Sequence, residues 1–175
     1  MQLSPIQLLE ANFEHISVAP SKSDWPKKTQ KAEFSMEINF EFGIAVIRED
    51  NDEFEYLLQI KYKTVADKRS SHPYSVDAEL SGRVRVTRFA ETQTPLNIKA
   101  TAAVTGCSML YGSLREMVAL ISGRCARGAW LLPTMTFAEI GRDIERDGKI
   151  EAAAALSESK PARARPKAKK IASKQ

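Results

Sequence analysis

The chain has 175 residues, of which 43% are apolar and 27% charged, and its net charge is +4. These values are typical of one soluble globular domain, and they exclude a fibre, a disordered polymer and, with only two cysteines, a disulfide-stapled scaffold. No apolar run approaches the roughly 20 residues of a membrane span, and Met1–Glu10 lacks the features of a secretory signal, so we expect a cytoplasmic protein.

The first predicted element is a strand over Asn12–Ala19, which ends at Pro20. Simple alternation places Phe13 on one face of this strand and Ile16 and Val18 on the other. The following segment, residues 21–31, contains a proline and four lysines, so we expect a loop there, and this loop carries Trp25.

Three longer strands follow, in residues 33–46, 54–62 and 74–86. Their even positions are almost all apolar, whereas their odd positions are mostly polar or charged. Only a strand places successive side chains on opposite faces, so each stretch is expected to have one buried and one exposed face. The short polar connections between them predict antiparallel hairpins.

The apolar period changes after Arg88. Large apolar residues three and four positions apart predict a helix from about Ser108 to Arg124, with stop signals at Gly123 and Gly128. An apolar crossover with a proline occupies residues 129–135, and a second helix is expected to begin near Phe137. Strands followed by helices predict an α+β fold: a four-stranded antiparallel sheet with two helices packed on one face.

The C-terminal end is strongly basic. Seven of the 26 basic residues and no acidic residue lie in the last sixteen positions, so the rest of the chain carries 19 basic and 22 acidic residues. We expect a folded domain over residues 1–157 and a disordered basic tail over 158–175. Two interpretations of the tail stay open: a solubilising extension, or weak contact with nucleic acid, an anionic lipid surface or an acidic protein.

The sequence has no pattern that indicates catalysis. His15 and His72 are the only histidines, and neither lies at a spacing from carboxylates or cysteines that builds a metal site or a triad. Cys107 and Cys125 have no zinc-binding spacing, so reduced thiols are expected. We therefore expect no enzyme activity, no cofactor and no metal.

Four segments carry a family resemblance when they are taken in order. They are Ile6–Pro20 followed by Asp24-Trp25, the hairpin of residues 54–65 and 74–86, the helix motif Leu110-Tyr111-Gly112-Ser113-Leu114-Arg115-Glu116, and the crossover Leu132-Pro133-Thr134-Met135-Thr136-Phe137. Over roughly residues 6–145 the chain resembles the SecB family of bacterial protein-export chaperones.

This resemblance implies an ATP-independent holdase chaperone that binds unfolded or extended client polypeptides. It also implies a homotetramer, assembled as a dimer of dimers with the long helices between dimers. The clients implied are either precursors for export, with transfer to a translocase motor, or the antitoxin of a toxin–antitoxin pair. A physical argument agrees, because a single sheet with two helices leaves apolar surface that self-association or a bound polypeptide must cover.

Two sets of site residues follow from this interpretation. The predicted client-binding residues are Trp25, Phe40, Phe42, Leu110, Tyr111, Leu114, Trp130 and Leu131. The predicted oligomer-interface residues are Leu114, Met117, Val118 and Ile121. For most of them a role in the core of the single chain is a competing interpretation. An alternative function, as a nucleic-acid-associated or adaptor protein, would act through the basic tail.

Overall fold

The structure is a computed structural model, and it describes residues 4–21, 38–50, 52–64, 72–88 and 91–158. Three of the sequence predictions lie outside these residues: the loop with Trp25, residues 33–37 of the second predicted strand, and residues 159–175 of the basic tail.

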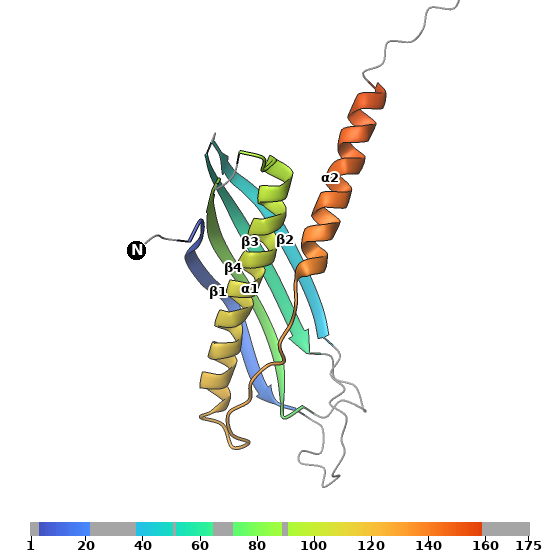
Figure 1. Ribbon diagram of the computed structural model, residues 1–175. Coiled ribbons are helices and arrows are strands. Elements are labelled where there is room, and N and C mark those ends of the chain that lie inside the picture. The colour runs from blue at the N-terminus through green and yellow to red at the C-terminus, as the bar shows by residue number, and fades with distance from the viewer. Residues whose placement is uncertain (1–3, 22–37, 51, 65–71, 89–90, 159–175) are drawn as a thin grey trace, which may run out of the picture.

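Four strands form one antiparallel sheet, and two helices follow them in the chain (Figure 1). The elements are β1 Ile6–Pro20, β2 Ile38–Glu49, β3 Glu53–Thr64, β4 Tyr74–Thr87, α1 Pro95–Ser122 and α2 Ala138–Glu158. The strand order is β1-β4-β3-β2, so β1 and β2 form the two edges. This arrangement confirms the predicted α+β class. In the described part of the chain, neither helix is long and apolar enough to cross a membrane.

The two central strands have the alternating burial that their sequences predict. Along β4, every even position from Tyr74 to Val86 is buried, and the odd positions between them are partly exposed. On β3, the side chains of Tyr56, Leu58, Ile60 and Tyr62 are fully buried. The buried face of the sheet is the face that α1 covers.

The predicted faces of the first strand are wrong. β1 begins at Ile6, and its pairing with β4 shifts register between Leu8 and Glu10 and again between Phe13 and His15. The second shift inserts one unpaired residue, which reverses the alternation beyond it. Phe13, Ile16 and Val18 therefore all pack against the core instead of lying on opposite faces.

Helix α1 begins thirteen residues before the predicted start at Ser108. Thr94 caps its N-terminus, since its side-chain oxygen accepts a hydrogen bond from the backbone N–H of Asn97, and Pro95 occupies the first turn. The first half of the helix packs through small side chains, which leave little apolar periodicity in the sequence. Its buried small residues are Ala100, Ala102, Ala103 and Gly106.

A glycine fixes how closely α1 approaches the sheet. A Cβ atom at Gly106 would lie 2.1 Å from the Cδ1 atom of Leu58 and 3.0 Å from a methyl group of Val84. On the strand side, a Cβ atom at Gly82 would lie 2.6 Å from a methyl group of Leu110. The helix and the sheet are therefore in contact at positions where even one added carbon has no room.

Helix α2 packs chiefly on α1, not on the sheet. A Cβ atom at Gly141 would lie 2.8 Å from Val104, and one at Gly148 would lie 2.5 Å from Leu96. These two close approaches hold α2 along the first half of α1. The remaining turns of α2 extend past the N-terminal end of α1 (Figure 1).

Candidate functional site: an apolar row on an edge strand

The edge strand β2 carries a row of apolar side chains on the face that continues the core. We call this set the β2 apolar row; its members are Ile38, Phe40, Phe42, Ile44 and Val46. They lie opposite Thr64, Tyr62, Ile60, Leu58 and Tyr56 of β3, respectively. The β3 partners are buried, whereas the β2 apolar row is at best half-buried.

Burial falls across these two strands because α1 does not reach β2. The helix packs on β1, β3 and β4. Phe40 is covered by Phe137 at the start of α2, with 5.3 Å between the ring centroids. At the other end of the row, Val46 is 47% exposed, and Ile47 beside it is 48% exposed. The uncovered apolar surface therefore lies toward the C-terminal end of β2.

The crossover between the helices is fixed to α1 by hydrogen bonds to its backbone carbonyls. The Tyr111 hydroxyl donates to the Pro133 carbonyl at 2.7 Å, and Arg115 Nε donates to the Leu132 carbonyl at 2.9 Å. These bonds turn Leu132 into the core, where it is 1% exposed, and leave Leu131 65% exposed. Burial raises the pKa of Tyr111 to about 12, so its hydroxyl remains a proton donor across the physiological range.

The start of the crossover is held by a buried tyrosine of β4. The Tyr74 hydroxyl lies 3.0 Å from the Gly128 carbonyl, to which it donates, and accepts a hydrogen bond from the Arg127 backbone N–H at 3.1 Å. The Trp130 ring lies 6.3 Å from the Tyr74 ring and stacks at 6.0 Å on His72. His72 is buried, with Nδ1 2.7 Å from the Tyr74 carbonyl.

Replacing Tyr74 with phenylalanine is expected to lower the free energy of unfolding by about 1–2 kcal/mol, because the partly buried backbone N–H of Arg127 loses its acceptor and the Gly128 carbonyl loses its donor. Tyr56→Phe is the matched control. The Tyr56 hydroxyl is also buried, but it has no hydrogen-bond partner among the described residues, so its removal should leave stability unchanged or raise it. Urea denaturation of both variants measures the difference, and equal losses would contradict the assignment.

The structure divides the predicted client-binding residues into two groups. Leu110, Tyr111 and Leu114 are buried between α1 and the sheet, so a client cannot reach them unless the helix moves. Phe40, Phe42 and Trp130 are partly buried at the margin of the core, and Leu131 is exposed. Sequence reasoning did not single out Val46 or Ile47. They are exposed because α1 packs on β1, β3 and β4 and does not extend over β2. No local sequence signal shows how far the helix extends across the sheet.

The predicted oligomer-interface residues are also divided. Leu114 and Val118 are fully buried against the sheet of their own chain, which is the competing interpretation given to them above. Met117 and Ile121 are partly exposed on the same helix, and Leu120 between them is 56% exposed. An interface along this part of α1 stays a prediction, with Met117, Leu120 and Ile121 as its accessible side chains.

The opposite face of the sheet carries paired charges. The ion pairs join neighbouring strands, with Lys63–Asp77 at 2.6 Å, Arg85–Glu55 at 2.7 Å, Lys61–Glu79 at 3.4 Å and Arg83–Glu10 at 3.6 Å. The hydrogen bond from Arg85 lowers the pKa of Glu55, so this pair stabilises the fold above the unfolded pKa of the carboxyl group and loses that effect as the pH falls through the lowered value.

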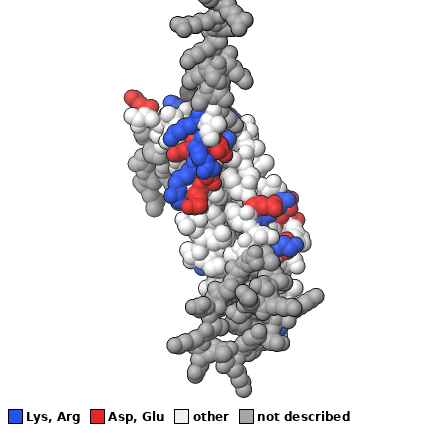
Figure 2. Space-filling view, turned by 90° about the vertical axis from the view of Figure 1, so that its right-hand side faces the viewer, with Lys and Arg blue, Asp and Glu red and all other residues white. Residues whose placement is uncertain are grey.

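On the side of the molecule that presents β2 and α2, the charged side chains gather in two separate groups, and each group contains both signs. Figure 2 shows one mixed group on α2 and a second group elsewhere on this side, with a broad uncharged surface between them. The charges of α2 include the ion pairs Arg142–Glu139 and Arg146–Asp143. The uncharged surface suits an apolar partner, because no unpaired charge has to be removed from water when it is covered.

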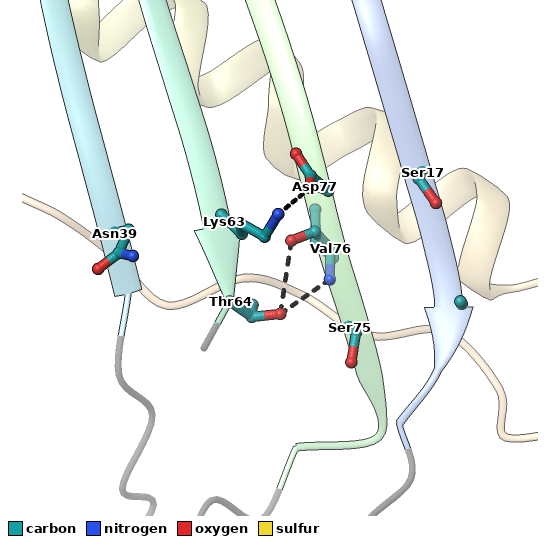
Figure 3. A pocket seen from close by; sticks show the side chains of 8 residues that line it. Ser17, Asn39, Lys63, Thr64, Ser75, Val76 and Asp77 are labelled. Carbon is teal, nitrogen blue, oxygen red and sulfur yellow. Dashed lines mark hydrogen bonds and ion pairs between the residues drawn. The ribbon is translucent and has the colours of Figure 1, made fainter. Parts of the chain in front are cut away.

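A pocket lies where the strand ends meet (Figure 3). Its volume is about 390 Å³, and its lining residues are Ser17, Ala19, Asn39, Lys63, Thr64, Ser75, Val76 and Asp77. Thr64 Oγ1 accepts a hydrogen bond from the Val76 N–H at 2.9 Å, and Lys63 pairs with Asp77. The strongest polar groups of the pocket are thus satisfied by each other. Within the described residues, no group of three or more His, Cys, Asp or Glu side chains could hold a metal ion.

No protein-family model and no curated protein sequence matches this chain. Among solved structures, a protein of unknown function from Streptococcus agalactiae has a TM-score of 0.52 and 8% identity, over 74% of this chain and 97% of that one. The Mycobacterium tuberculosis SecB-like chaperone Rv1957, in complex with a ChAD peptide from the Rv1956 HigA1 antitoxin, has a TM-score of 0.45 and 19% identity, over 74% of this chain and 90% of that one. The first likeness supports the fold described above.

Proposed function

We propose that this chain is an ATP-independent holdase chaperone that binds unfolded or non-native polypeptides. The observation that carries the proposal is the β2 apolar row, which joins the core on one side and is left uncovered toward Val46 on the other. Apolar surface that continues the core is costly to leave in water, and a non-native chain exposes the apolar side chains that can cover it. The SecB-like sequence segments support the same function.

The uncovered surface also supports self-association. Leu120 on α1 and Leu131 in the crossover are both more than half exposed, and both lie outside the β2 apolar row. A homotetramer built as a dimer of dimers, with α1 between the dimers, would cover Leu120 and leave the β2 apolar row for clients. The client pool in this proposal is either precursors for export or an antitoxin.

The test is the suppression of aggregation of a chemically denatured model client, measured by light scattering without nucleotide. The purified chain should suppress aggregation in proportion to its concentration, and native mass spectrometry should give a tetramer. A monomer that leaves the aggregation curve unchanged would overturn the proposal. Addition of ATP should make no difference to the suppression.

The alternative, a nucleic-acid-associated or adaptor protein, is favoured by one observation only: seven basic and no acidic residues in the last sixteen positions. Deletion of residues 160–175 discriminates between the two functions. The chaperone proposal expects suppression of aggregation to survive this deletion. Loss of suppression together with loss of retention on immobilised RNA would favour the alternative.

A further inference from the structure

Among the described elements the outer edge of β2 has no partner, and the ladder of β2 is more regular than that of the other edge strand. The pairing of β1 with β4 is interrupted by two register shifts, which disturb the backbone in the manner of bulges. The pairing of β2 with β3 runs without interruption from Ile38 to Val46. No described element pairs with the outer edge of this stretch. Its outward N–H and C=O groups are therefore a template for one more strand.

The two faces of β2 differ in chemistry. One face is the β2 apolar row, and the other face carries Asn39, Glu41, Gly43 and Ala45. A strand added at this edge would continue both faces, because the side chains of paired residues lie on the same face. It would therefore alternate apolar residues, beside the β2 apolar row, with polar residues beside Glu41 and Gly43.

A hollow lies on the polar face of the edge, at the one position that has no side chain. It has a volume of about 130 Å³, and its lining residues are Glu41, Phe42, Gly43, Gln59 and Lys61. A Cβ atom at Gly43 would meet only the Cβ atom of Gln59, at 3.9 Å. The missing side chain thus leaves space that a neighbouring strand can fill.

The hollow is lined by one anion, Glu41, and one cation, Lys61, which lie opposite each other on β2 and β3, and of these two Lys61 is already held in an ion pair. Lys61 pairs with Glu79 at 3.4 Å, and the Gln59 amide donates to the same carboxylate at 2.7 Å, so both point their donors toward β4. Glu41 lies at the edge, is exposed, and makes no ion pair with another described residue. A Lys or Arg side chain across from Gly43 would place its charge beside Glu41 without displacing an existing pair.

We propose that β2 takes an extended client segment as a fifth strand, with a Lys or Arg side chain of the client seated in the hollow at Gly43 against Glu41. This mode of binding rests on the proposed chaperone function and names the segments it prefers: apolar residues alternating with polar ones, with a basic residue among the latter. A second copy of β2 fits this requirement less well, because its one cation, Arg48, lies beyond the register shift and already pairs with Asp50 at 2.8 Å.

The test uses synthetic strands of about nine residues that alternate valine and threonine, with either lysine or glutamate at the central polar position. Fluorescence anisotropy should give tighter binding for the lysine peptide, by about fivefold. Glu41→Lys should reverse this preference, and Glu116→Lys, an equal charge change at an exposed position of α1, should not. Gly43→Val should fill the hollow and remove the preference while leaving the fold intact, since valine is favoured in strands and has space there.

The backbone ladder is tested separately by N-methylation of the lysine peptide. Methyl groups on the amides of one edge should weaken binding by at least about tenfold, and methyl groups on the other edge should not, because only one edge of the added strand faces β2. The inference is overturned if both methylated peptides bind equally well, or if none of the three variants changes the peptide preference. In either case the unmodified chain would still suppress aggregation. A changed native mass of Glu41→Lys would identify a second copy as the occupant and also overturn it. Absence of suppression in the same preparation is instead the failure of the proposed function.

Discussion

Gly106→Val is expected to lower the free energy of unfolding by about 3 kcal/mol, the upper end of the range for overpacked cores. The added Cβ atom would lie 2.1 Å from Cδ1 of Leu58, which is fully buried, so turning this side chain away would press it against other close-packed core residues. Relief requires α1 to move away from the sheet, which would loosen the contacts of Leu110 and Leu114 with β3 and β4. Chemical denaturation followed by far-ultraviolet circular dichroism measures the loss.

Gly112→Val is the matched control on the same helix. A Cβ atom at Gly112 meets nothing within 4 Å, so the substitution adds no clash. Valine has a somewhat better helix propensity than glycine, and the expected change in stability is below about 0.5 kcal/mol. If both variants unfold at the same denaturant concentration, the close approach at Gly106 does not set the spacing between α1 and the sheet.

Val46→Asp is expected to weaken the binding of a denatured client by about tenfold or more. The substitution places a carboxylate in the uncovered part of the β2 apolar row, where a bound client would have to remove it from water. Because Val46 is already 47% exposed in the free chain, the fold itself should tolerate the change. Binding is measured by anisotropy of a labelled client held unfolded by reduction of its disulfides.

The control places the same charge on the neighbouring residue. Ala45 is exposed on the opposite face of β2, across from Leu57 and away from the β2 apolar row. Ala45→Asp should leave client affinity unchanged, or raise it for basic clients. Equal weakening by both substitutions would show that net charge, not the β2 apolar row, governs the affinity.

The strands were predictable where residues alternate without interruption. β2, β3 and β4 follow the even positions of the sequence because their pairing keeps one register over most of their length. β1 does not, because one inserted residue near Phe13 reverses its alternation. A bulge leaves no composition signal here, so alternation alone does not locate it.

The helices were predictable where their buried residues are large. Leu110, Leu114 and Val118 give the period of α1, while the preceding turns pack largely through alanine and glycine, with Ile98 as their one large buried residue, and so give a weak period. The Thr94-Pro95 pair was the signal that could have located the true start.

The candidate site was predictable only in part. Phe40 and Phe42 follow from strand alternation, but the exposure that makes part of β2 accessible depends on how far α1 and the crossover extend over it. Leu110 and Leu114, predicted as client-binding residues with a core role as the competing interpretation, lie buried between α1 and the sheet.

The length of α2 separates its C-terminal end from the edge of β2 that is proposed to take a client strand. The helix has 21 residues, a span of roughly 30 Å, and its last turns stand clear of α1, so the basic segment begins well away from Phe137 and the crossover. An anion held by that segment and a guest strand on β2 would then not compete for space.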